Sequence, residues 1–441
     1  MLKEKALQVL DELANNVIKN IGPTKLVVGL SGGADSTLVL LIAKRITELN
    51  GEFSALAVHC IHGLDADDPI WFNHCTSLCK RVGVPLVTPK LNIIYGDGKS
   101  PEDVSRQERY RALLENTRDG ALMLGHHADD QVESFLLALK RGSGPYGLSG
   151  MRFILNDERG TIIRPLLTLH KREIIEIIEA LGYDYVFDIS NTYLKFERNF
   201  IRLKVLPLLK ERFSGIEKSI LRSSLLCSYE HDLASRYAKE YFDLAYDRDN
   251  DCLCIDKLDL KDEPLVTSIM RLFISTKVVM PPEFNTVLLA VKLCSIGPDQ
   301  NMRVSLDEGC TLRRYKDRLY IVKNAKTPEK GQYTLEYGKV LVLGDYEYRL
   351  VEDCSSKESF ANGRVVLDFD YKGSQCLKPL KRIHSREIKK LFGEYNIPTW
   401  KRPSQCLVKD QAGHILAFGS LFVTAENSIE KGYKLQITCL K

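Results

Sequence analysis

The run Ser-Gly-Gly-Ala-Asp-Ser at residues 31–36 constrains this chain more than any other feature of its sequence. It follows the apolar segment 26–30 and leads directly into a second apolar segment, 37–42, so it predicts a buried strand, a glycine turn and a helix. Such a junction directs several backbone N–H groups and the positive end of the helix dipole at one point, which favours the binding of an anion. The expected anion-binding residues are Ser31, Gly32, Gly33, Ala34, Asp35 and Ser36.

The turn differs from the usual nucleotide-binding P-loop, because it lacks a Gly-Lys-Ser or Gly-Lys-Thr ending and carries the carboxylate of Asp35. A bare carboxylate repels phosphate, so Asp35 indicates a Mg²⁺ ion that bridges the loop and its anion. A purely structural alternative is that Asp35 and Ser36 only cap the helix. Polar residues at the ends of other expected strands favour the interpretation as a binding site over that of a helix cap.

Strand-like and helix-like segments alternate from residue 26 to about residue 190, which predicts an α/β fold with a doubly wound parallel sheet. Ligands of such sheets bind beyond the carboxyl ends of the strands. His59 and the run Gly125-His126-His127 follow two of the expected strands, so we expect them beside the glycine turn. The expected strands are 26–30, 53–59, 85–90 and 121–125, and the expected helices are 1–21, 37–49, 70–81, 103–117 and 129–141.

Two neighbouring aspartates, Asp129 and Asp130, begin the helix expected over 129–141, and Glu133 shares a face with Asp129. Acidic residues in a first helical turn often serve only as caps. Adjacent aspartates at the same sheet edge as Asp35 favour a metal-binding or acid–base role. We expect Asp35 and Asp130 to bind the metal, although the sequence does not decide which of Asp129 and Asp130 is the ligand and which is the base.

Arg106 and Arg109 lie three residues apart on the helix expected over 103–117, so both can face the same sheet edge. Arginine suits a phosphate group because its planar fork donates two parallel hydrogen bonds. The alternative is a solvated basic face that pairs with acidic neighbours on the same helix. The arginine pair is therefore a candidate phosphate clamp.

The composition limits the classes of protein to which this chain can belong. Hydrophobic residues make up 44% of the chain and charged residues 27%, the ordinary range for a soluble globular protein. No apolar run approaches the roughly 18–20 residues that cross a bilayer, so we expect no membrane span. The 12 cysteines include no Cys-x-x-Cys pair, which argues against a zinc finger and favours reduced thiols in a cytoplasmic enzyme.

Positive charge is concentrated at the carboxyl end of the chain. The final 81 residues hold 14 lysines and arginines against 7 acidic residues, whereas the whole chain has a net charge of +4. A basic tail favours a polyanionic partner such as nucleic acid, although a solvated basic face is the plain alternative. The length of 441 residues predicts two or three domains. We place them at 1–215, 216–330 and 331–441, with a C-terminal core at about 361–441 and a helix over 385–395.

Taken together, these motifs resemble the PP-loop superfamily of N-type ATP pyrophosphatases, which adenylate a carbonyl oxygen and release pyrophosphate. Within this superfamily the chain resembles the tRNA(Ile)-lysidine synthetases over most of residues 25–205, and its tail segments Ile397–Pro403 and Phe418–Thr424 resemble the C-terminal domain of that family. Small departures are Asp65, where a basic residue is frequent, and Ser134, which replaces a threonine. The matching positions of the first domain are Ser31–Ser36, His59, His62–Leu64, Arg106, Arg109–Tyr110, Gly125–Gln131, Glu133, Arg141–Gly144, Gly147–Leu148, Arg164–Leu167, Asp188, Ser190–Asn191, Arg198–Asn199 and Arg202.

The resemblance implies an adenine nucleotide α hydrolase-like fold for the first domain, a mostly helical middle domain and a small α+β C-terminal domain. It also implies a two-step reaction on the wobble cytidine of the minor isoleucine tRNA, tRNA(Ile) with a CAU anticodon. In the first step the 2-carbonyl oxygen of the base attacks the α-phosphate of ATP, and pyrophosphate leaves. In the second step the ε-amine of free L-lysine attacks carbon 2 of the base, and AMP leaves. The product is lysidine.

The resemblance further implies roles for the residues named above. The turn from Ser31 to Ser36 grips the pyrophosphate portion of ATP, Asp35 holds Mg²⁺, and Arg106 stabilises charge at the α-phosphate. Asp129 or Asp130 positions the lysine, accepts its proton or shares the metal. The expected tRNA contacts are Arg198, Arg202, Arg382, Arg386, Lys389, Lys390, Lys401 and Arg402, with Trp400 as a candidate for base stacking.

Three other functions use parts of the same pattern. A tRNA thiolase of the superfamily needs reactive cysteines, commonly in Cys-x-x-Cys or cluster-ligating arrangements. A small-molecule amidotransferase or synthetase has little need for a basic tail, and a nucleotide sensor joined to an RNA-binding module has little need for Asp35, Arg106 and the aspartate pair together. The sequence leaves open how lysine and isoleucine tRNA are selected, which part of the tRNA the tail contacts, and whether the chain forms a homodimer.

Overall fold

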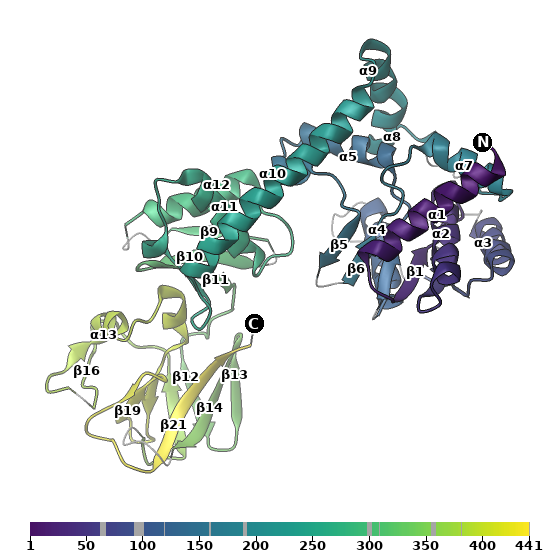
Figure 1. Cartoon of the computed structure of the whole chain (residues 1–441). Coiled ribbons are helices and arrows are strands. Elements are labelled where there is room, and N and C mark those ends of the chain that lie inside the picture. The colour runs from purple at the N-terminus through teal and green to yellow at the C-terminus, as the bar shows by residue number, and fades with distance from the viewer. Residues whose placement is uncertain are drawn as a thin grey trace. The chain divides into compact units, whose positions relative to one another are not determined.

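The computed structural model describes residues 1–61, 68–91, 101–118, 120–157, 160–187, 192–297, 302–307, 309–353, 359–380 and 382–440. The chain forms two compact units, Met1–Leu233 and Ala234–Lys441 (Figure 1). The division into three domains at residues 215 and 330 stays a prediction. The motif positions His62–Leu64, Asp65, Asp188 and Ser190–Asn191 lie outside the described residues.

A six-stranded sheet forms the centre of the first unit. Its strands are β1 (Lys25–Gly29), β2 (Ser54–Val58), β3 (Leu86–Val87), β4 (Gly120–Met123), β5 (Ile154–Asp157) and β6 (Gly160–Ile163). They lie in the order β3-β2-β1-β4-β6-β5. Neighbouring strands run parallel except β5 and β6, which form an antiparallel hairpin at the edge of the sheet.

Helices cover both faces of this sheet, as a doubly wound fold requires (Figure 1). The helices that begin in this unit are α1 (Lys3–Asn20), α2 (Ala34–Leu49), α3 (Asp68–Val82), α4 (Pro101–Glu115), α5 (Ala128–Lys140), α6 (Pro145–Leu148), α7 (Lys171–Leu181), α8 (Glu197–Phe200), α9 (Leu206–Arg212) and the long α10 (Ile216–Ala245), with a π-helical turn at Ile201–Val205. One core joins α1, α2, α3 and α7 to the face of β1 that carries Leu26 and Val28. A second core packs Leu113 of α4 against Val27 on the opposite face.

The order in which the chain adds strands to the sheet reverses between β1 and β4. These strands are neighbours, with β2 and β3 on one side and β6 and β5 on the other. Open α/β sheets bind their ligands at such a switch point, beyond the carboxyl ends of the strands. The chain leaves β1 into the glycine turn and leaves β4 into Gly125, His126 and His127. Both motifs therefore reach the same edge of the sheet.

Most predicted elements of this unit are confirmed: the five predicted helices correspond to α1–α5, and three of the four predicted strands to β1, β2 and β4. The strand predicted over 85–90 is reduced to Leu86–Val87. Pro85 and Pro89 flank it and have no N–H group to donate to a neighbouring strand. The β5–β6 hairpin and α7 were not predicted from the sequence.

Helix α7 nevertheless carries ordinary helix signals. Ile174, Ile177 and Ile178 repeat at helical spacing and are buried. His170 and Glu173 form a capping box at its start, in which the backbone N–H of His170 donates to Glu173 Oε2 at 2.7 Å. Gly182, at a φ of 74°, ends the helix in the left-handed conformation.

The second unit begins within α10 and continues into a five-stranded sheet that packs against two helices. Phe273 and Leu319 lie at the centre of this core. The sheet has the order β7-β8-β11-β10-β9, and each pair of neighbours is antiparallel. The elements are β7 (Tyr246–Asp247), β8 (Cys252–Cys254), α11 (Glu263–Ser275), α12 (Phe284–Ser295), β9 (Arg303–Ser305), β10 (Cys310–Tyr315) and β11 (Arg318–Lys323).

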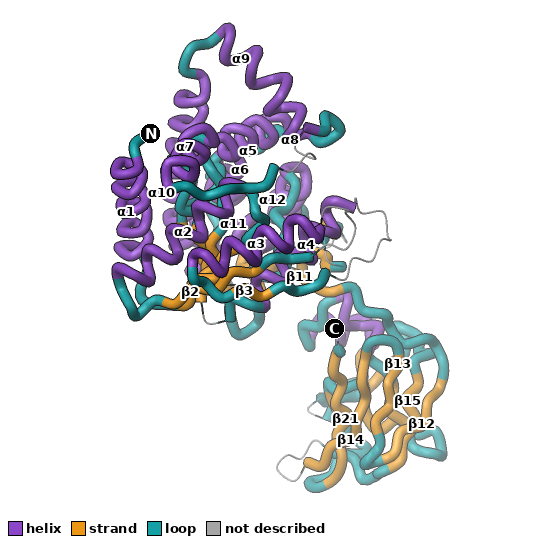
Figure 2. The backbone as a smooth tube through the Cα atoms, turned by 90° about the vertical axis from the view of Figure 1, so that its right-hand side faces the viewer, coloured by secondary structure: helices purple, strands orange, loops and turns teal. Residues whose placement is uncertain are grey.

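The C-terminal part contains antiparallel strands that share one core around Tyr348 and Phe360 (Figure 2). One sheet contains β12 (Gln332–Glu336), β15 (Arg364–Asp368), β18 (Leu407–Lys409), β19 (Ile415–Phe418) and β20 (Phe422–Val423), and another contains β13 (Val340–Leu343), β14 (Tyr346–Asp353) and β21 (Gly432–Cys439). The helix predicted over 385–395 is α13 (Ile388–Glu394). It begins later than expected because β17 (Arg386–Glu387) pairs with β16 (Cys376–Leu377).

Every helix that the structure describes is too short or too polar to cross a bilayer.

Candidate active site

The glycine turn closes around the hydroxyl group of Ser36. This oxygen accepts the backbone N–H groups of Ser31 and Gly32, each at 3.2 Å, and donates to the carbonyl oxygen of Gly33 at 3.0 Å. Gly32 has a φ of +90°, and a Cβ atom there would lie 3.2 Å from Cys75 Sγ. The turn is therefore a preformed loop at the start of α2, where the helix dipole favours an anion.

Gly125 allows the end of β4 to approach this turn closely. A Cβ atom at Gly125 would lie 2.9 Å from the Cβ atom of Asp35 and 3.0 Å from its carbonyl carbon. A larger residue would separate the two strand ends. Gly125 therefore has a steric role in this structure, and its predicted contact with a nucleotide stays a prediction.

His59 connects the ends of β1 and β2. Its ring is buried, and Nδ1 donates to the carbonyl oxygen of Leu30 at 2.9 Å. The side chain supports the strand that leads into the glycine turn. Its predicted contact with a nucleotide stays a prediction.

The structure brings Asp35 and Asp130 to the same imidazole ring. His127 Nε2 lies 3.8 Å from Asp35 Oδ1 and 3.5 Å from Asp130 Oδ2. The backbone N–H of His127 also donates to Asp130 Oδ2 at 3.0 Å, which fixes this carboxylate at the start of α5. The two predicted metal ligands therefore flank one nitrogen atom although they are far apart in the sequence.

Asp35 has a second partner that the sequence analysis did not predict. The ammonium group of Lys171, at the start of α7, lies 2.8 Å from each carboxylate oxygen of Asp35. The contact joins residues 136 positions apart. The sequence around Lys171 indicates only that a helix begins there. Local spacing does not show which carboxylate the lysine contacts.

Asp129 binds the start of the same helix. Its carboxylate accepts hydrogen bonds from His170 Nδ1 at 2.7 Å and from the backbone N–H of Lys171 at 2.8 Å. Burial alone would raise the pKa of Asp129, but these hydrogen bonds outweigh it and lower the pKa. Asp129 therefore remains ionised and connects α5 to α7.

Glu133 and Arg202 form a buried ion pair next to the aspartates. Arg202 donates to the two carboxylate oxygens of Glu133 at 2.6 and 3.2 Å, and its Nη2 lies 3.7 Å from Asp130 Oδ1. The Glu133 side chain is fully buried, and the Arg202 side chain is 35% exposed. Arg198 donates to Ser134 Oγ at 3.2 Å. Both arginines were predicted to contact tRNA, and the structure places both against α5.

His126 lies in a positively charged environment at the end of β4. Burial lowers its pKa to about 4; Asp130 opposes this shift, and the charges of Arg164, Arg198 and Arg106 add to it. His126 is therefore neutral at physiological pH. Arg106 is exposed on α4, and its positive charge contributes to the lowered pKa of His126. Burial raises the pKa of Cys60, which follows β2, and the positive charge of Arg109 opposes this shift.

The residues present suit a nucleotide with a divalent cation. Hard oxygen ligands, which Mg²⁺ prefers, are available from Asp35 and Asp130, and both carboxylates lie beside the phosphate-binding loop. The ammonium group of Lys171 lies at the same edge, where it can neutralise phosphate charge. The phosphate contact of Arg106 stays a prediction. The donor set therefore fits ATP with Mg²⁺.

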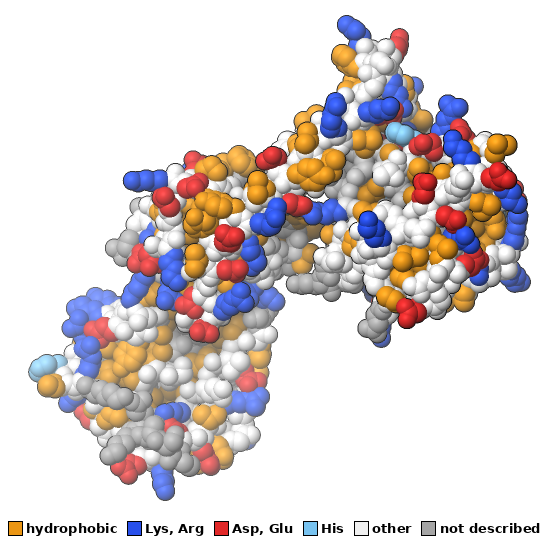
Figure 3. Space-filling model, viewed as in Figure 1, with side chains coloured by type: hydrophobic (Ala, Val, Ile, Leu, Met, Phe, Trp, Pro, Cys, Tyr) orange, Lys and Arg blue, Asp and Glu red, His pale blue; other side chains and the backbone are white. Residues whose placement is uncertain are grey.

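The predicted tRNA-binding cations of the second unit are gathered around α13, where Figure 3 shows a concentration of Lys and Arg side chains. Four of them share two carboxylates: Glu394 pairs with Arg382 and Arg386, and Glu387 pairs with Lys389 and Lys390. Two carboxylates do not neutralise four cations, so a net positive patch remains, and its side chains are 38–61% exposed.

The remaining tail candidates differ in their surroundings. Lys401 is exposed, whereas Arg402 donates from Nε to the carbonyl oxygen of Ile397 at 3.1 Å. The Trp400 ring lies 5.3 Å from the ring of Tyr320 and 5.8 Å from the guanidinium carbon of Arg313. Trp400 therefore packs within its own unit in this structure.

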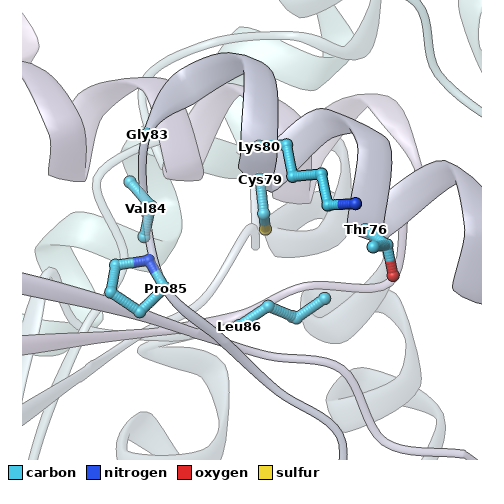
Figure 4. Close-up of a pocket in the computed structure, with 7 residues that line it drawn as sticks. All are labelled: Thr76, Cys79, Lys80, Gly83, Val84, Pro85 and Leu86. Atoms are coloured by element: carbon cyan, nitrogen blue, oxygen red, sulfur yellow. The ribbon is translucent and has the colours of Figure 1, made fainter.

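A shallow depression of about 460 Å³ lies between α3 and β3, away from the predicted site residues (Figure 4). Figure 4 shows Lys80 and Thr76 on the helical side and Pro85 and Leu86 on the strand side. None of the seven residues that line it was predicted to bind a ligand, and we assign it no function.

An aspartate-containing glycine turn at the switch point of a parallel sheet defines a PP-loop ATP-binding protein, and residues 4–209 match the PP-loop domain family. Residues 365–438 match a second family, the TilS substrate C-terminal domain. A tRNA(Ile)-lysidine synthase of Vibrio parahaemolyticus is 34% identical to the chain over 409 residues, which cover 91% of this chain and 92% of the relative. The enzyme of the same name from Photobacterium profundum is 31% identical, covering 94% and 96%. The chain belongs to the tRNA(Ile)-lysidine synthase family.

Replacement of Arg202 with methionine is expected to lower the free energy of unfolding by about 3 kcal/mol, because it leaves the buried carboxylate of Glu133 without a counter-charge. Urea unfolding followed by circular dichroism measures this loss. Arg172→Met is the matched control, since the Arg172 side chain is 90% exposed. A loss for Arg202→Met as small as that of the control would show that the pair does not stabilise the fold.

The unfolding free energy is expected to decrease as the pH falls from about 6.5 to about 4. In this range the unfolded His126 takes up a proton, whereas the folded residue, with a pKa of about 4, does not. The stabilisation is therefore present above pH 6.5 and is lost towards pH 4. His126→Gln should remove this part of the pH dependence when both proteins are unfolded in urea across the range. Equal slopes for the two proteins would contradict the assignment.

Proposed function

We propose that this chain is an ATP-dependent carbon–nitrogen ligase that joins free L-lysine to carbon 2 of the wobble cytidine of tRNA(Ile) with a CAU anticodon. The observation that carries the proposal is the switch-point site, where the Asp35 turn faces Asp130 across His127. Relatives with the corresponding name cover nine-tenths of the chain. We also propose a cytoplasmic location, which is supported by the thiols of Cys60, Cys75 and Cys79, buried near the sheet and not joined in disulfides.

In the first step, the 2-carbonyl oxygen of cytidine attacks the α-phosphate of ATP. The backbone N–H groups at the start of α2 bind the leaving pyrophosphate, and they are oriented before the substrate arrives. Arg106 stabilises the charge that develops on the α-phosphate. Because His126 is neutral, it adds no positive charge and stays available as a hydrogen-bonding group beside the base.

In the second step, the ε-amine of lysine attacks carbon 2 of the adenylated base and AMP leaves. The amine must lose a proton, and a carboxylate of the Asp129–Asp130 pair accepts it. Asp129 is fixed by His170 and by the backbone of Lys171, so it orients this part of the site. Asp130 keeps one oxygen on the backbone of His127 and presents the other towards Arg202.

Asp35 and Asp130 would hold Mg²⁺, which supplies positive charge to the triphosphate when it is bound. The basic patch around α13 would bind the tRNA backbone through its phosphates. Such contacts supply affinity and position, whereas the identity of the tRNA requires contacts to bases or to shape.

The thiolase alternative conflicts with the cysteines of this site. Burial raises the pKa of Cys60 to about 11, of Cys75 to about 12 and of Cys79 to about 11. These thiols are therefore protonated at physiological pH and poor nucleophiles. Sulfur transfer has no suitable residue among the described cysteines near the glycine turn.

The direct test supplies ATP, a transcript of tRNA(Ile) and labelled lysine, and detects lysidine by mass spectrometry of the digested tRNA. We expect lysine incorporation together with release of AMP and pyrophosphate. Asp35→Asn is expected to lower pyrophosphate release by more than about 100-fold while tRNA binding persists. Sulfur incorporation without lysine, or turnover without tRNA, would contradict the proposed function.

The double change Lys389→Glu and Lys390→Glu is expected to weaken tRNA binding and to flatten its dependence on salt, because it removes two phosphate contacts. Filter binding at several salt concentrations measures both effects. The affinity for ATP should remain unchanged, since these residues belong to the second unit. The matched control is Lys239→Glu, an exposed lysine of α10. An unchanged salt slope in the double variant would exclude the patch as a tRNA contact.

A further inference from the structure

Lys171 is held by hydrogen bonds at its backbone, whereas its partly exposed side chain is held only through the ammonium group at its end. Its N–H donates to Asp129 Oδ2 at 2.8 Å, and it directly follows the capping residue His170 at the start of α7. Its ammonium group reaches Asp35 through a flexible stem of four carbons, and the Lys171 side chain is 41% exposed. The side chain can therefore move without any displacement of α7.

The contact with Asp35 uses the oxygens that a metal ion would need. The ammonium group lies 2.8 Å from both carboxylate oxygens. A Mg²⁺ ion binds oxygen at roughly 2.0–2.1 Å, so an ion on Asp35 would compete with the ammonium group for the same oxygens. The two cations also repel one another, which makes simultaneous contact unfavourable.

We propose that Lys171 is an exchangeable internal cation: it neutralises Asp35 in the nucleotide-free protein, and it moves onto the phosphates of ATP when Mg²⁺ takes its place. This inference rests on the proposed function, because it concerns the same ATP site. Asp35 is the second residue of α2, whose first turn forms the phosphate site. A lysine ammonium is a compact cation that binds phosphate as a point charge. A small rotation of the stem therefore transfers Lys171 from the carboxylate to the nucleotide.

The exchange has a consequence that a purely structural lysine would not have. Without Lys171, Asp35 keeps only the more distant His127 ring, 3.8 Å from its Oδ1, so a divalent cation binds the carboxylate more easily. The nucleotide loses a positive partner, so it binds less tightly. The two affinities are thus expected to change in opposite directions.

The test uses the full chain and two probes: Mn²⁺ alone, followed by electron paramagnetic resonance, and a non-hydrolysable ATP analogue with Mg²⁺, followed by calorimetry. Lys171→Gln should bind Mn²⁺ about fivefold more tightly and the analogue about tenfold more weakly. Lys171→Arg keeps the charge and should retain most of the analogue affinity. Arg172→Gln is the matched control, because the neighbouring side chain is 90% exposed and pairs with Glu176.

An unchanged Mn²⁺ affinity in Lys171→Gln, an unchanged analogue affinity, or a loss of both affinities together overturns the inference. Failure of the proposed function gives a different result, because the unaltered chain would then form no lysidine or would not bind the ATP analogue. A melting curve of Lys171→Gln within about 2 °C of the unaltered chain confirms that the fold is retained, since a partly exposed ion pair contributes little to stability.

Discussion

The site depends on one electrostatic conflict: a carboxylate, Asp35, lies inside a loop that is built to bind phosphate. The positive end of α2 and the backbone of the glycine turn attract an anion, whereas Asp35 repels it. The surrounding residues compensate this negative charge. Lys171 contacts both oxygens of Asp35, and His127 lies between Asp35 and Asp130. This compensation is local, and the proposed displacement of Lys171 would allow a metal ion and a nucleotide to enter.

The geometry behind this arrangement could be predicted in large part from the sequence. The apolar segment before Ser31 and the strand before Gly125 indicated parallel strands, and the carboxyl ends of such strands meet at one edge. That argument correctly brought Asp35 and Asp130 together. The steric reason was visible only in the structure, because the distance between Gly125 and Asp35 depends on the order of the strands.

Other parts of the site could not be predicted, because they depend on contacts between distant segments. Lys171 reaches Asp35 across 136 residues, and Arg202 reaches Glu133 across 69. Local spacing placed Glu133 on a face with Asp129, and the family resemblance implied a tRNA contact for Arg202. In the structure Glu133 is fully buried and Arg202 is its counter-charge, so a contribution of Arg202 to tRNA binding would have to coexist with that ion pair.

The central claim is that Asp35 binds the divalent cation that accompanies ATP at the β1–β4 edge. Pulsed electron paramagnetic resonance of Mn²⁺ with a non-hydrolysable ATP analogue tests it most directly when the aspartate carboxyl carbons of the chain carry ¹³C, because coupling between the ion and ¹³C reports a carboxylate ligand. We predict ¹³C coupling in the unaltered chain and a weaker ¹³C coupling, with a lower Mn²⁺ affinity, in Asp35→Asn. The same coupling and the same Mn²⁺ affinity in both proteins would contradict the account.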